Sequence, residues 1–120
     1  MKNLAPHIFR QRLLIEGFYT IQMSQEILEK YLLNLAEHLN LRTYSNPIVF
    51  SPASGMGRDE NAGFDAFVPL IDSGISAYIW SSAKFFSIVI YTCKGFDEQM
   101  AIEFTRKSLA VSGEIASQSF

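Results

Sequence analysis

Two side chains in this sequence, Ser73 and Cys93, are of types that can take part in catalysis. Ser73 stands in Asp72-Ser73-Gly74 between two predicted strands, where such residues also form ordinary turns. Cys93 is the only cysteine and ends an apolar strand. A lone cysteine there is either a reactive thiol or, more often, a small buried hydrophobe. Both interpretations stay open for each residue.

Two further candidates are an aromatic hydroxyl and a charged loop residue. Tyr78 could donate a hydroxyl proton in a pocket, or could pack as an aromatic residue of a strand. Arg58 could bind a carboxylate or a phosphate if its loop closes over a ligand, and is otherwise solvated. The Gly-x-Gly at residues 55–57 does not stand between a strand and a helix, so it indicates a phosphate site only weakly.

The histidines do not form a recognisable site. His7 and His38 are far apart, and neither has a cysteine or carboxylate at ligand spacing. They also supply no Ser-His-Asp arrangement. We therefore predict no metal. The single cysteine excludes a disulfide framework within one chain and fits a reducing compartment.

The composition is typical of one folded domain over residues 1–120. Hydrophobic residues make up 48% of the chain and aromatic residues 13%, which is enough for a core. The net charge of -2, without clustered lysine and arginine, argues against a nucleic-acid partner. The N-terminal residues do not resemble a signal peptide, and no stretch is long enough to cross a membrane. We expect a cytoplasmic protein without a membrane partner.

Hydrophobic periodicity predicts the order strand, helix, four strands, helix. The helices are expected after the N-cap Ser24 and from Asp97 to about Ala110. Strands are expected over residues 12–20, 42–51, 64–71, 75–80 and 84–92. Pro47 interrupts the second strand, and the tail from Val111 is expected to fray. Short turns between consecutive strands indicate an α+β two-layer sandwich, with a mostly antiparallel sheet and both helices on one face.

The last predicted strand of the sheet is apolar on both faces. Its alternating positions are Phe86, Ile88 and Ile90 on one side and Phe85, Val89 and Tyr91 on the other. Two helices can cover only one face of a sheet. The second face therefore predicts a homodimer or a higher homo-oligomer. The alternative is that the loop and the C-terminal tail cover it.

The segment from Asp72 to Trp80, with the strand that ends at Cys93, resembles the core motif of bacterial S-adenosylmethionine decarboxylases. In that family the motif reads Glu-Ser-His-Ile-Ser-Ile-His-Thr-Trp-Pro-Glu, and a later strand closes with Phe-Thr-Cys. The residues of this chain that match in register are Ser73, Ile75, Ser76, Trp80, Thr92 and Cys93. Gly63 falls on a family glycine. The resemblance covers most of the chain, apart from the loop at residues 51–61.

The resemblance implies an S-adenosylmethionine decarboxylase fold and a specific chemistry. In the family, the serine attacks the preceding peptide carbonyl, the chain breaks there, and the serine becomes a pyruvoyl group. That group forms a Schiff base with the substrate amine and accepts the electrons released on decarboxylation, after which the cysteine returns a proton. Ser73, Cys93 and Tyr78 are then the expected catalytic residues. The expected substrate-binding residues are Trp80, Ser76 and Arg58.

Several positions depart from the family pattern. The two histidines of the motif are replaced by Gly74 and Tyr78, and the carboxylate after the tryptophan is replaced by Ser82. A family serine and a family aspartate correspond to Asp65 and Val89. A tyrosine hydroxyl is a poor base near neutral pH, so self-processing is the step most affected.

Three functions are compatible with this sequence. The first is a divergent homologue that is not self-processed, needs no cofactor, and binds an adenosylmethionine-like or amine metabolite or a partner protein. The second is an active decarboxylase of polyamine (spermidine) biosynthesis, with a pyruvoyl group made from Ser73. The third is an interaction domain that keeps only the fold. We rank them in that order.

Overall fold

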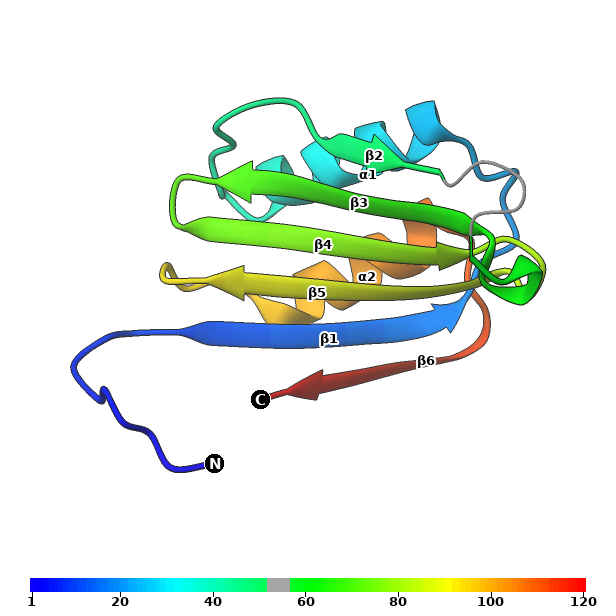
Figure 1. Cartoon of the computed structure of the whole chain (residues 1–120). Coiled ribbons are helices and arrows are strands. Elements are labelled where there is room, and N and C mark those ends of the chain that lie inside the picture. Colours follow the sequence, from blue (N-terminus) through cyan, green and yellow to red (C-terminus); the bar gives the residue numbers. More distant parts are fainter. Residues whose placement is uncertain (52–56) are drawn as a thin grey trace.

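The computed structural model of the chain describes residues 1–51 and 57–120, and these form a six-stranded sheet with two α-helices on one face (Figure 1). The spatial order of the strands is β2-β3-β4-β5-β1-β6, and all neighbouring pairs are antiparallel. The strands are β1 (Gln11–Phe18), β2 (Ile48–Phe50), β3 (Gly63–Leu70), β4 (Ser73–Trp80), β5 (Phe85–Thr92) and β6 (Ser112–Ser119). The helices are α1 (Gln25–His38) and α2 (Glu98–Ser108), with a short 3₁₀ turn at Asp59–Asn61. The predicted α+β sandwich is confirmed.

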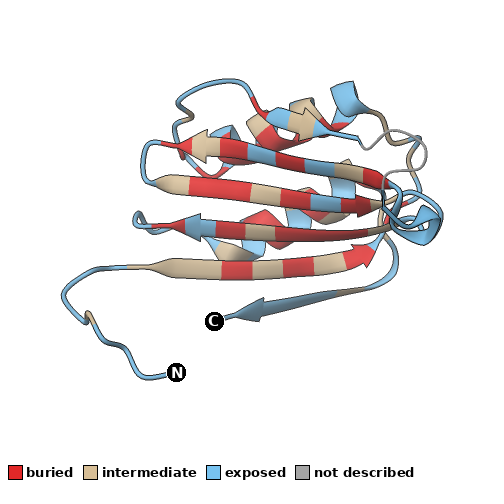
Figure 2. Ribbon diagram, in the orientation of Figure 1, coloured by how far each residue is buried: buried red, intermediate tan, exposed pale blue. Residues whose placement is uncertain are grey.

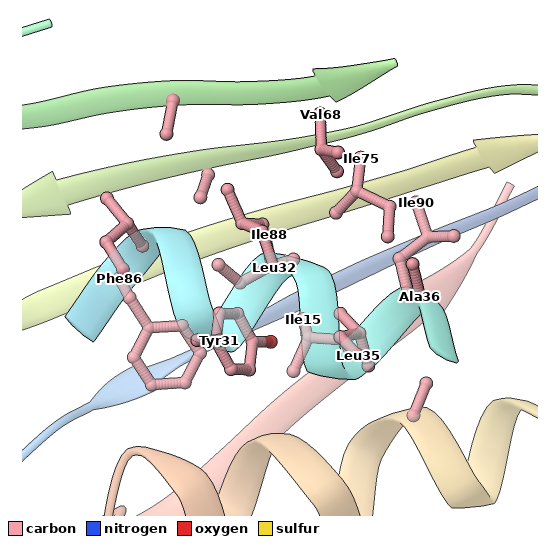
Figure 3. Close-up of a cluster of buried hydrophobic side chains, with 14 of the residues drawn as sticks. Ile15, Tyr31, Leu32, Leu35, Ala36, Val68, Ile75, Phe86, Ile88 and Ile90 are labelled. Atoms are coloured by element: carbon pink, nitrogen blue, oxygen red, sulfur yellow. The ribbon is translucent and has the colours of Figure 1, made fainter. Parts of the chain in front are cut away.

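The helix α1 begins where its capping residue predicts. The hydroxyl of Ser24 accepts a hydrogen bond from the backbone N–H of Ile27, which satisfies one of the free donors of the first turn. The buried side of the helix, with Leu28, Leu32 and Leu35, packs onto the sheet among the side chains of Figure 3. The apolar spacing read from the sequence therefore does face the core.

The two helices are joined through one buried hydrogen bond. The hydroxyl oxygens of Tyr31 on α1 and Thr105 on α2 lie 2.6 Å apart, and both residues are buried. Helix α2 itself is capped by Asp97, whose carboxylate accepts from the N–H of Met100. The helical layer is thus fixed internally as well as against the sheet.

The prediction of a frayed C-terminal tail is wrong. Residues 112–119 form β6, which pairs with β1 and closes that side of the sheet. The hydroxyl of Ser119 also donates to the carboxylate of Glu98 at 2.6 Å. The tail is small and polar because it is an edge strand with almost no buried side chain, and Ile115 is its one residue packed against the core. Backbone pairing rather than side-chain burial holds it.

The strand predicted over residues 42–51 is shorter in the structure. Only Ile48–Phe50 forms β2, and Thr43 makes an isolated bridge to Leu70. Pro47 stands immediately before β2 and has no N–H to donate to a ladder, which explains the interruption. Part of the loop at residues 51–61, residues 52–56, lies outside the described residues.

One face of the sheet is not covered by helices, and we call it the open face. It carries exposed aromatic side chains, of which Phe67, Tyr78 and Tyr91 keep 42%, 40% and 38% of their surface accessible. Figure 2 shows the resulting alternation of buried and exposed residues along the strands. The alternative that the C-terminal tail covers this face is wrong, since the tail extends the sheet sideways as β6.

Candidate functional site

The fold brings Ser73 and Cys93 together. Ser73 begins β4 and pairs with Thr92, the last residue of β5, so that Cys93 follows directly beside it. The hydroxyl oxygen of Ser73 and the sulfur of Cys93 lie 3.6 Å apart, in hydrogen-bonding contact. Cys93 is exposed rather than buried, so its role as a small core hydrophobe is not what the structure shows.

The peptide bond in front of Ser73 is hydrogen-bonded to the segment that follows β5. The carbonyl oxygen of Asp72 accepts a hydrogen bond of 2.9 Å from the backbone N–H of Cys93. Such a donor polarises a carbonyl and stabilises negative charge that develops on its oxygen. Ser73 itself has a φ of 131°, a conformation that side-chain-bearing residues rarely adopt and that is found preferentially at functional sites.

Tyr78 does not approach Ser73 within one chain. Five residues of an extended strand separate them, which is about 17 Å. Tyr78 points from the open face, where its neighbours across the ladders are Asp65 and Ser87. The hydroxyl of Ser87 donates in turn to the carboxylate of Glu16 at 2.8 Å. Tyr78 therefore belongs to a polar row that crosses the open face.

The space next to Gly74 is filled by an aromatic ring. A Cβ atom at this position would overlap the ring of Phe67, the adjacent open-face residue on β3. The histidine that the family carries here could be accommodated only if that ring moved. By contrast, a Cβ atom at Gly63 would overlap the backbone carbonyl of Ile79, which requires a glycine at that position.

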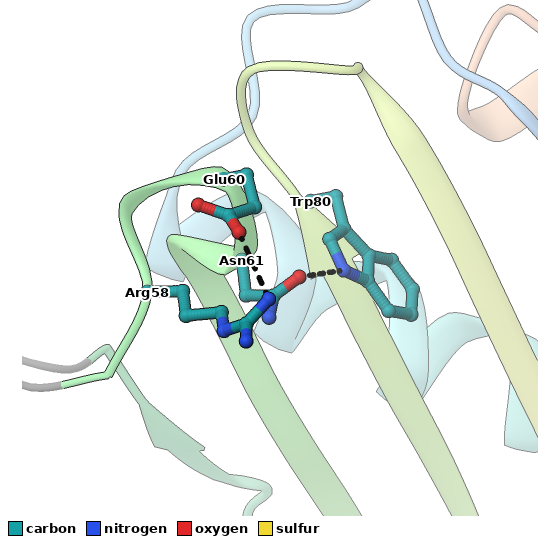
Figure 4. A network of polar contacts seen from close by, with 4 residues as sticks. All are labelled: Arg58, Glu60, Asn61 and Trp80. Carbon is teal, nitrogen blue, oxygen red and sulfur yellow. Dashed lines mark hydrogen bonds and ion pairs between the residues drawn. The ribbon is translucent and has the colours of Figure 1, made fainter.

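Trp80 and Arg58 lie at the opposite end of the sheet from Ser73. Trp80 is the last residue of β4, and its indole N–H donates to the side chain of Asn61 at 3.2 Å (Figure 4). Among the described residues, the side chain of Arg58 contacts Glu60, at 3.4 Å, and both side chains are largely exposed. The chain thus does not bring these two predicted binding residues to the Ser73–Cys93 pair.

Ser76 lines a shallow hollow on the open face. The hollow has a volume of about 300 Å³, and its other residues are Ile48, Phe50, Asp65, Ala66, Phe67 and Tyr78. Ser76 is half-buried between the strands, and Asp65 supplies the one carboxylate. This hollow joins Ser76 and Tyr78 but does not contain Ser73 or Cys93.

A second hollow, at the Ser73 end of the sheet, was not anticipated from the sequence. It has a volume of about 670 Å³ and is lined by Leu33, Glu37, Asn40, Leu41, Arg42, Thr43 and Lys94. These residues come from the end of α1, the segment after it, and the turn after β5. Only the position of Lys94 immediately after Cys93 could have pointed to it.

A metal-binding cluster and a membrane-spanning helix are both absent from the part of the chain that the structure describes. No group of three or more histidine, cysteine, aspartate or glutamate side chains is arranged to hold a metal ion there. Over the same residues, no helix is both long enough and apolar enough to cross a membrane.

The structure is an α+β sandwich in which a serine and a cysteine meet at one end of the sheet. Comparison with known proteins identifies the family to which this class of structure belongs. The model of the S-adenosylmethionine decarboxylase family matches residues 16–118, so the chain belongs to that family. A crystal structure of the adenosylmethionine decarboxylase from Aquifex aeolicus VF5 superposes with a TM-score of 0.73. It is 18% identical, and the match covers 94% of this chain and 89% of that one. No curated protein matches the chain in sequence.

The family is pyruvoyl-dependent in general, and the residues present fit that group only in part. Ser73, which corresponds to the family serine, lies 3.6 Å from the thiol of Cys93. The base is not, since Cys93 is the only side-chain hydrogen-bond partner of Ser73 among the described residues and Tyr78 points from the open face.

Proposed function

We propose that this chain is an S-adenosylmethionine decarboxylase-like protein that stays uncleaved and binds an adenosylmethionine-like or amine metabolite. The observation that carries the first part is the loss of both motif histidines, since Gly74 and Tyr78 stand at their positions. Tyr78 occupies the position of the family histidine, and Ser73 has no other ionisable side chain than Cys93 as a hydrogen-bond partner among the described residues. Serine is a weak nucleophile without an adjacent base.

The second part is supported by two hollows of different charge. The hollow at the Ser73 end carries Arg42 and Lys94, and the hollow on the open face carries Asp65 beside aromatic side chains. An acidic, aromatic surface suits a cationic metabolite such as a sulfonium or an amine. Ligand sites commonly combine an apolar lining with a few charged groups in this way.

A second candidate function is an active pyruvoyl-dependent decarboxylase, and one observation favours it. The carbonyl of Asp72, which the serine would attack, accepts the N–H of Cys93, and Ser73 has a strained φ. Both features suit a peptide bond prepared for cleavage. A partner-binding domain without a ligand is the third candidate, and ligand-dependent thermal unfolding separates it from a metabolite binder.

We further propose that two copies associate through their open faces. The exposed aromatic residues of that face are Phe18, Phe67, Tyr78 and Tyr91, and they lie in and on both sides of the polar row of Asp65, Ser87 and Glu16. A facing copy would cover them as a second layer.

Intact mass of the purified protein tests cleavage directly. The uncleaved protein gives one species of 13.6 kDa, whereas processing gives fragments of residues 1–72 and 73–120. A Ser73→Ala variant is the control, because it keeps the fold but has no hydroxyl to attack the peptide. Fragments that appear in the wild type and are absent from the variant would overturn the proposal in favour of the decarboxylase.

Thermal unfolding with ligand tests the binding part. S-adenosylmethionine and putrescine are added separately at saturating concentration. We expect at least one of them to raise the Tm of the uncleaved protein. Constant Tm values with both compounds would favour the partner-binding domain instead.

A further inference from the structure

The chain before β1 forms one wall of a small cavity. In Figure 1, this N-terminal segment, residues 1–10, turns back from the start of β1 toward the end of β6. The cavity has a volume of about 90 Å³, and the residues that line it are Met1, Asn3, Ile8, Arg10 and Arg12. Two of these residues are arginines and none is acidic, so the cavity has a positive lining.

Arg10 fixes the shape of the N-terminal segment. Its guanidinium donates to the side-chain oxygen of Asn3 at 2.7 Å. It also donates to the backbone carbonyls of Ala5 and Ile8, each at 3.1 Å. The same oxygen of Asn3 accepts from the N–H of Ala5 at 3.0 Å. This wall of the cavity is therefore ordered before an ion binds, which lowers the entropic cost of binding.

Arg12 brings an uncompensated charge to the cavity. Its Nε is buried and has no hydrogen-bond partner, and it is the one such side-chain atom within residues 1–51 and 57–120. The neighbours of Arg12 on both adjacent strands are aromatic. Tyr91 is its partner on β5, and its guanidinium carbon lies 5.4 Å from the centre of the Phe120 ring. A ring face attracts a cation but does not neutralise it.

No acidic side chain of the described residues neutralises either arginine. The ion pairs in this part of the chain lie at the 3₁₀ turn and on α2, and neither includes Arg10 or Arg12. Glu16, the acidic residue of β1, accepts a hydrogen bond from Ser87 instead. Two like charges at one cavity repel each other, and a partly buried cation without a partner is costly. A bound anion would relieve both effects.

The size of the cavity limits the kind of anion. Metabolite sites usually have volumes of about 300–1,000 Å³, whereas a single water needs roughly 10–15 Å³ of free volume. At about 90 Å³, the cavity has room for an ion of a few heavy atoms. Guanidinium groups bind the oxygens of phosphate in bidentate geometry, and two of them match its two negative charges.

We infer that this cavity binds a small tetrahedral oxyanion such as inorganic phosphate. Arg10 and Arg12 hold its oxygens, and the side-chain NH₂ group of Asn3 is a third donor at the same cavity. The bound anion connects the N-terminal segment to β1 and so holds that segment against the sheet. The inference is independent of the proposed function, because neither Ser73 nor Cys93 lines this cavity.

The test uses the full chain at constant ionic strength, with inorganic phosphate, acetate and chloride as probes. NMR follows the Nε–Hε signal of Arg12 and the backbone amides of Asn3 and Arg10. Because the Nε of Arg12 is closed to solvent, its proton should exchange slowly enough to be observed. Phosphate is expected to shift these signals along a saturable curve. Acetate, with one charge, is expected to bind about tenfold more weakly, and chloride is expected to give no saturable shift.

Variants assign the contact. Arg12→Gln is expected to weaken phosphate binding about tenfold, measured at the Asn3 amide, because a charge-assisted contact is lost. Lys30→Gln removes an exposed charge from α1 and is the matched control, so its phosphate affinity should equal that of the wild type. Phosphate should also raise the Tm of the wild type and of Lys30→Gln more than that of Arg12→Gln. The amide signals of α1 report whether each variant is folded.

A further variant separates binding from association of the open faces. Phe67→Asp changes the open face without touching the cavity, and it should keep the phosphate affinity of the wild type. Phosphate shifts that disappear in the folded Phe67→Asp chain would overturn the inference, since they would report association of copies.

Three other results would also overturn the inference. They are shifts that are the same for all three anions, the absence of any saturable shift, and an Arg12→Gln variant that binds phosphate as Lys30→Gln does. Equal affinities for phosphate and acetate would overturn the assignment to a tetrahedral oxyanion. The proposed function is tested by intact mass and by stabilisation with S-adenosylmethionine, so either proposal can fail while the other stands.

Discussion

The hydroxyl oxygen of Ser73 lies 3.6 Å from the sulfur of Cys93, at the point where β4 begins and β5 ends. The contact follows from the register of the two strands, which pairs Ser73 with Thr92 and leaves Cys93 beside the turn. The same register places Tyr78 on the open face, next to Ser87. One ladder thus brings two of the predicted catalytic residues together and separates the third from them.

The first prediction concerns the packing of Phe67 over Gly74. Gly74→Ala is expected to destabilise the protein by about 1–2 kcal/mol, because the new Cβ atom displaces the ring. The cost should largely disappear in a Phe67→Ala background, as measured by urea unfolding in a double-mutant cycle. Gly95→Ala is the control, since its nearest neighbour would be 3.9 Å away. Additive effects of the two changes would contradict the proposed contact.

The second prediction concerns alkaline pH. Burial raises the pKa of Tyr31 above its ordinary value of 10.0, against a smaller opposing effect of the hydrogen bond to Thr105. The unfolded chain therefore loses this proton at lower pH than the folded chain does. The resulting stability is fully present below pH 10 and is lost as the pH rises above it, by up to about 1.4 kcal/mol per pH unit.

A Tyr31→Phe variant tests this sign. It should be less stable than the wild type at pH 7 by about 1–3 kcal/mol, since the buried hydroxyl of Thr105 loses its partner. Its stability should also fall less steeply above pH 10. Equal slopes in urea unfolding series from pH 9 to 11 would show that Tyr31 is not the group responsible.

The sequence predicts the parts of this fold that are held by buried side chains and misses the part that is held by backbone pairing. Helix α1 and strand β5 were found because Leu28, Leu32, Ile88 and their neighbours repeat with the period of their element. Strand β6 was missed because an edge strand held by backbone pairing carries no such period. The residues of β6 are mostly small and polar, as those of a frayed tail also are.

The candidate site was predictable only where the family motif carried it. Ser73 and Cys93 came from spacing and resemblance, and the structure adds that they are in contact. The charged hollow was not predictable, because Glu37, Arg42 and Lys94 share no motif and meet only through the turn after α1 and the end of β5. Trp80 lies at the other end of the sheet because Ser73 and Trp80 are the first and last residues of β4. The binding roles of Trp80 and Arg58 stay predictions.

The third prediction concerns β6. A chain that ends at Val111 is expected to lose about 1–3 kcal/mol of stability, because several backbone hydrogen bonds to β1 and the contact of Ser119 with Glu98 are lost. Amide hydrogen exchange in β1 should rise most, because this strand becomes an edge. Removal of Met1 and Lys2, which make no hydrogen bonds among the described residues, is the control. Unchanged exchange in β1 would contradict the pairing.

The last prediction concerns the open face. Phe67→Asp places a charge in the middle of the exposed aromatic surface and should convert a dimer into a monomer, because a buried unpaired carboxylate is costly at an apolar interface. Ile27→Asp makes the same kind of change on the exposed side of α1, away from the sheet, and should leave the assembly intact. Light scattering coupled to size-exclusion chromatography measures both. A wild-type monomer, or equal dissociation of the two variants, would rule out association through the open face.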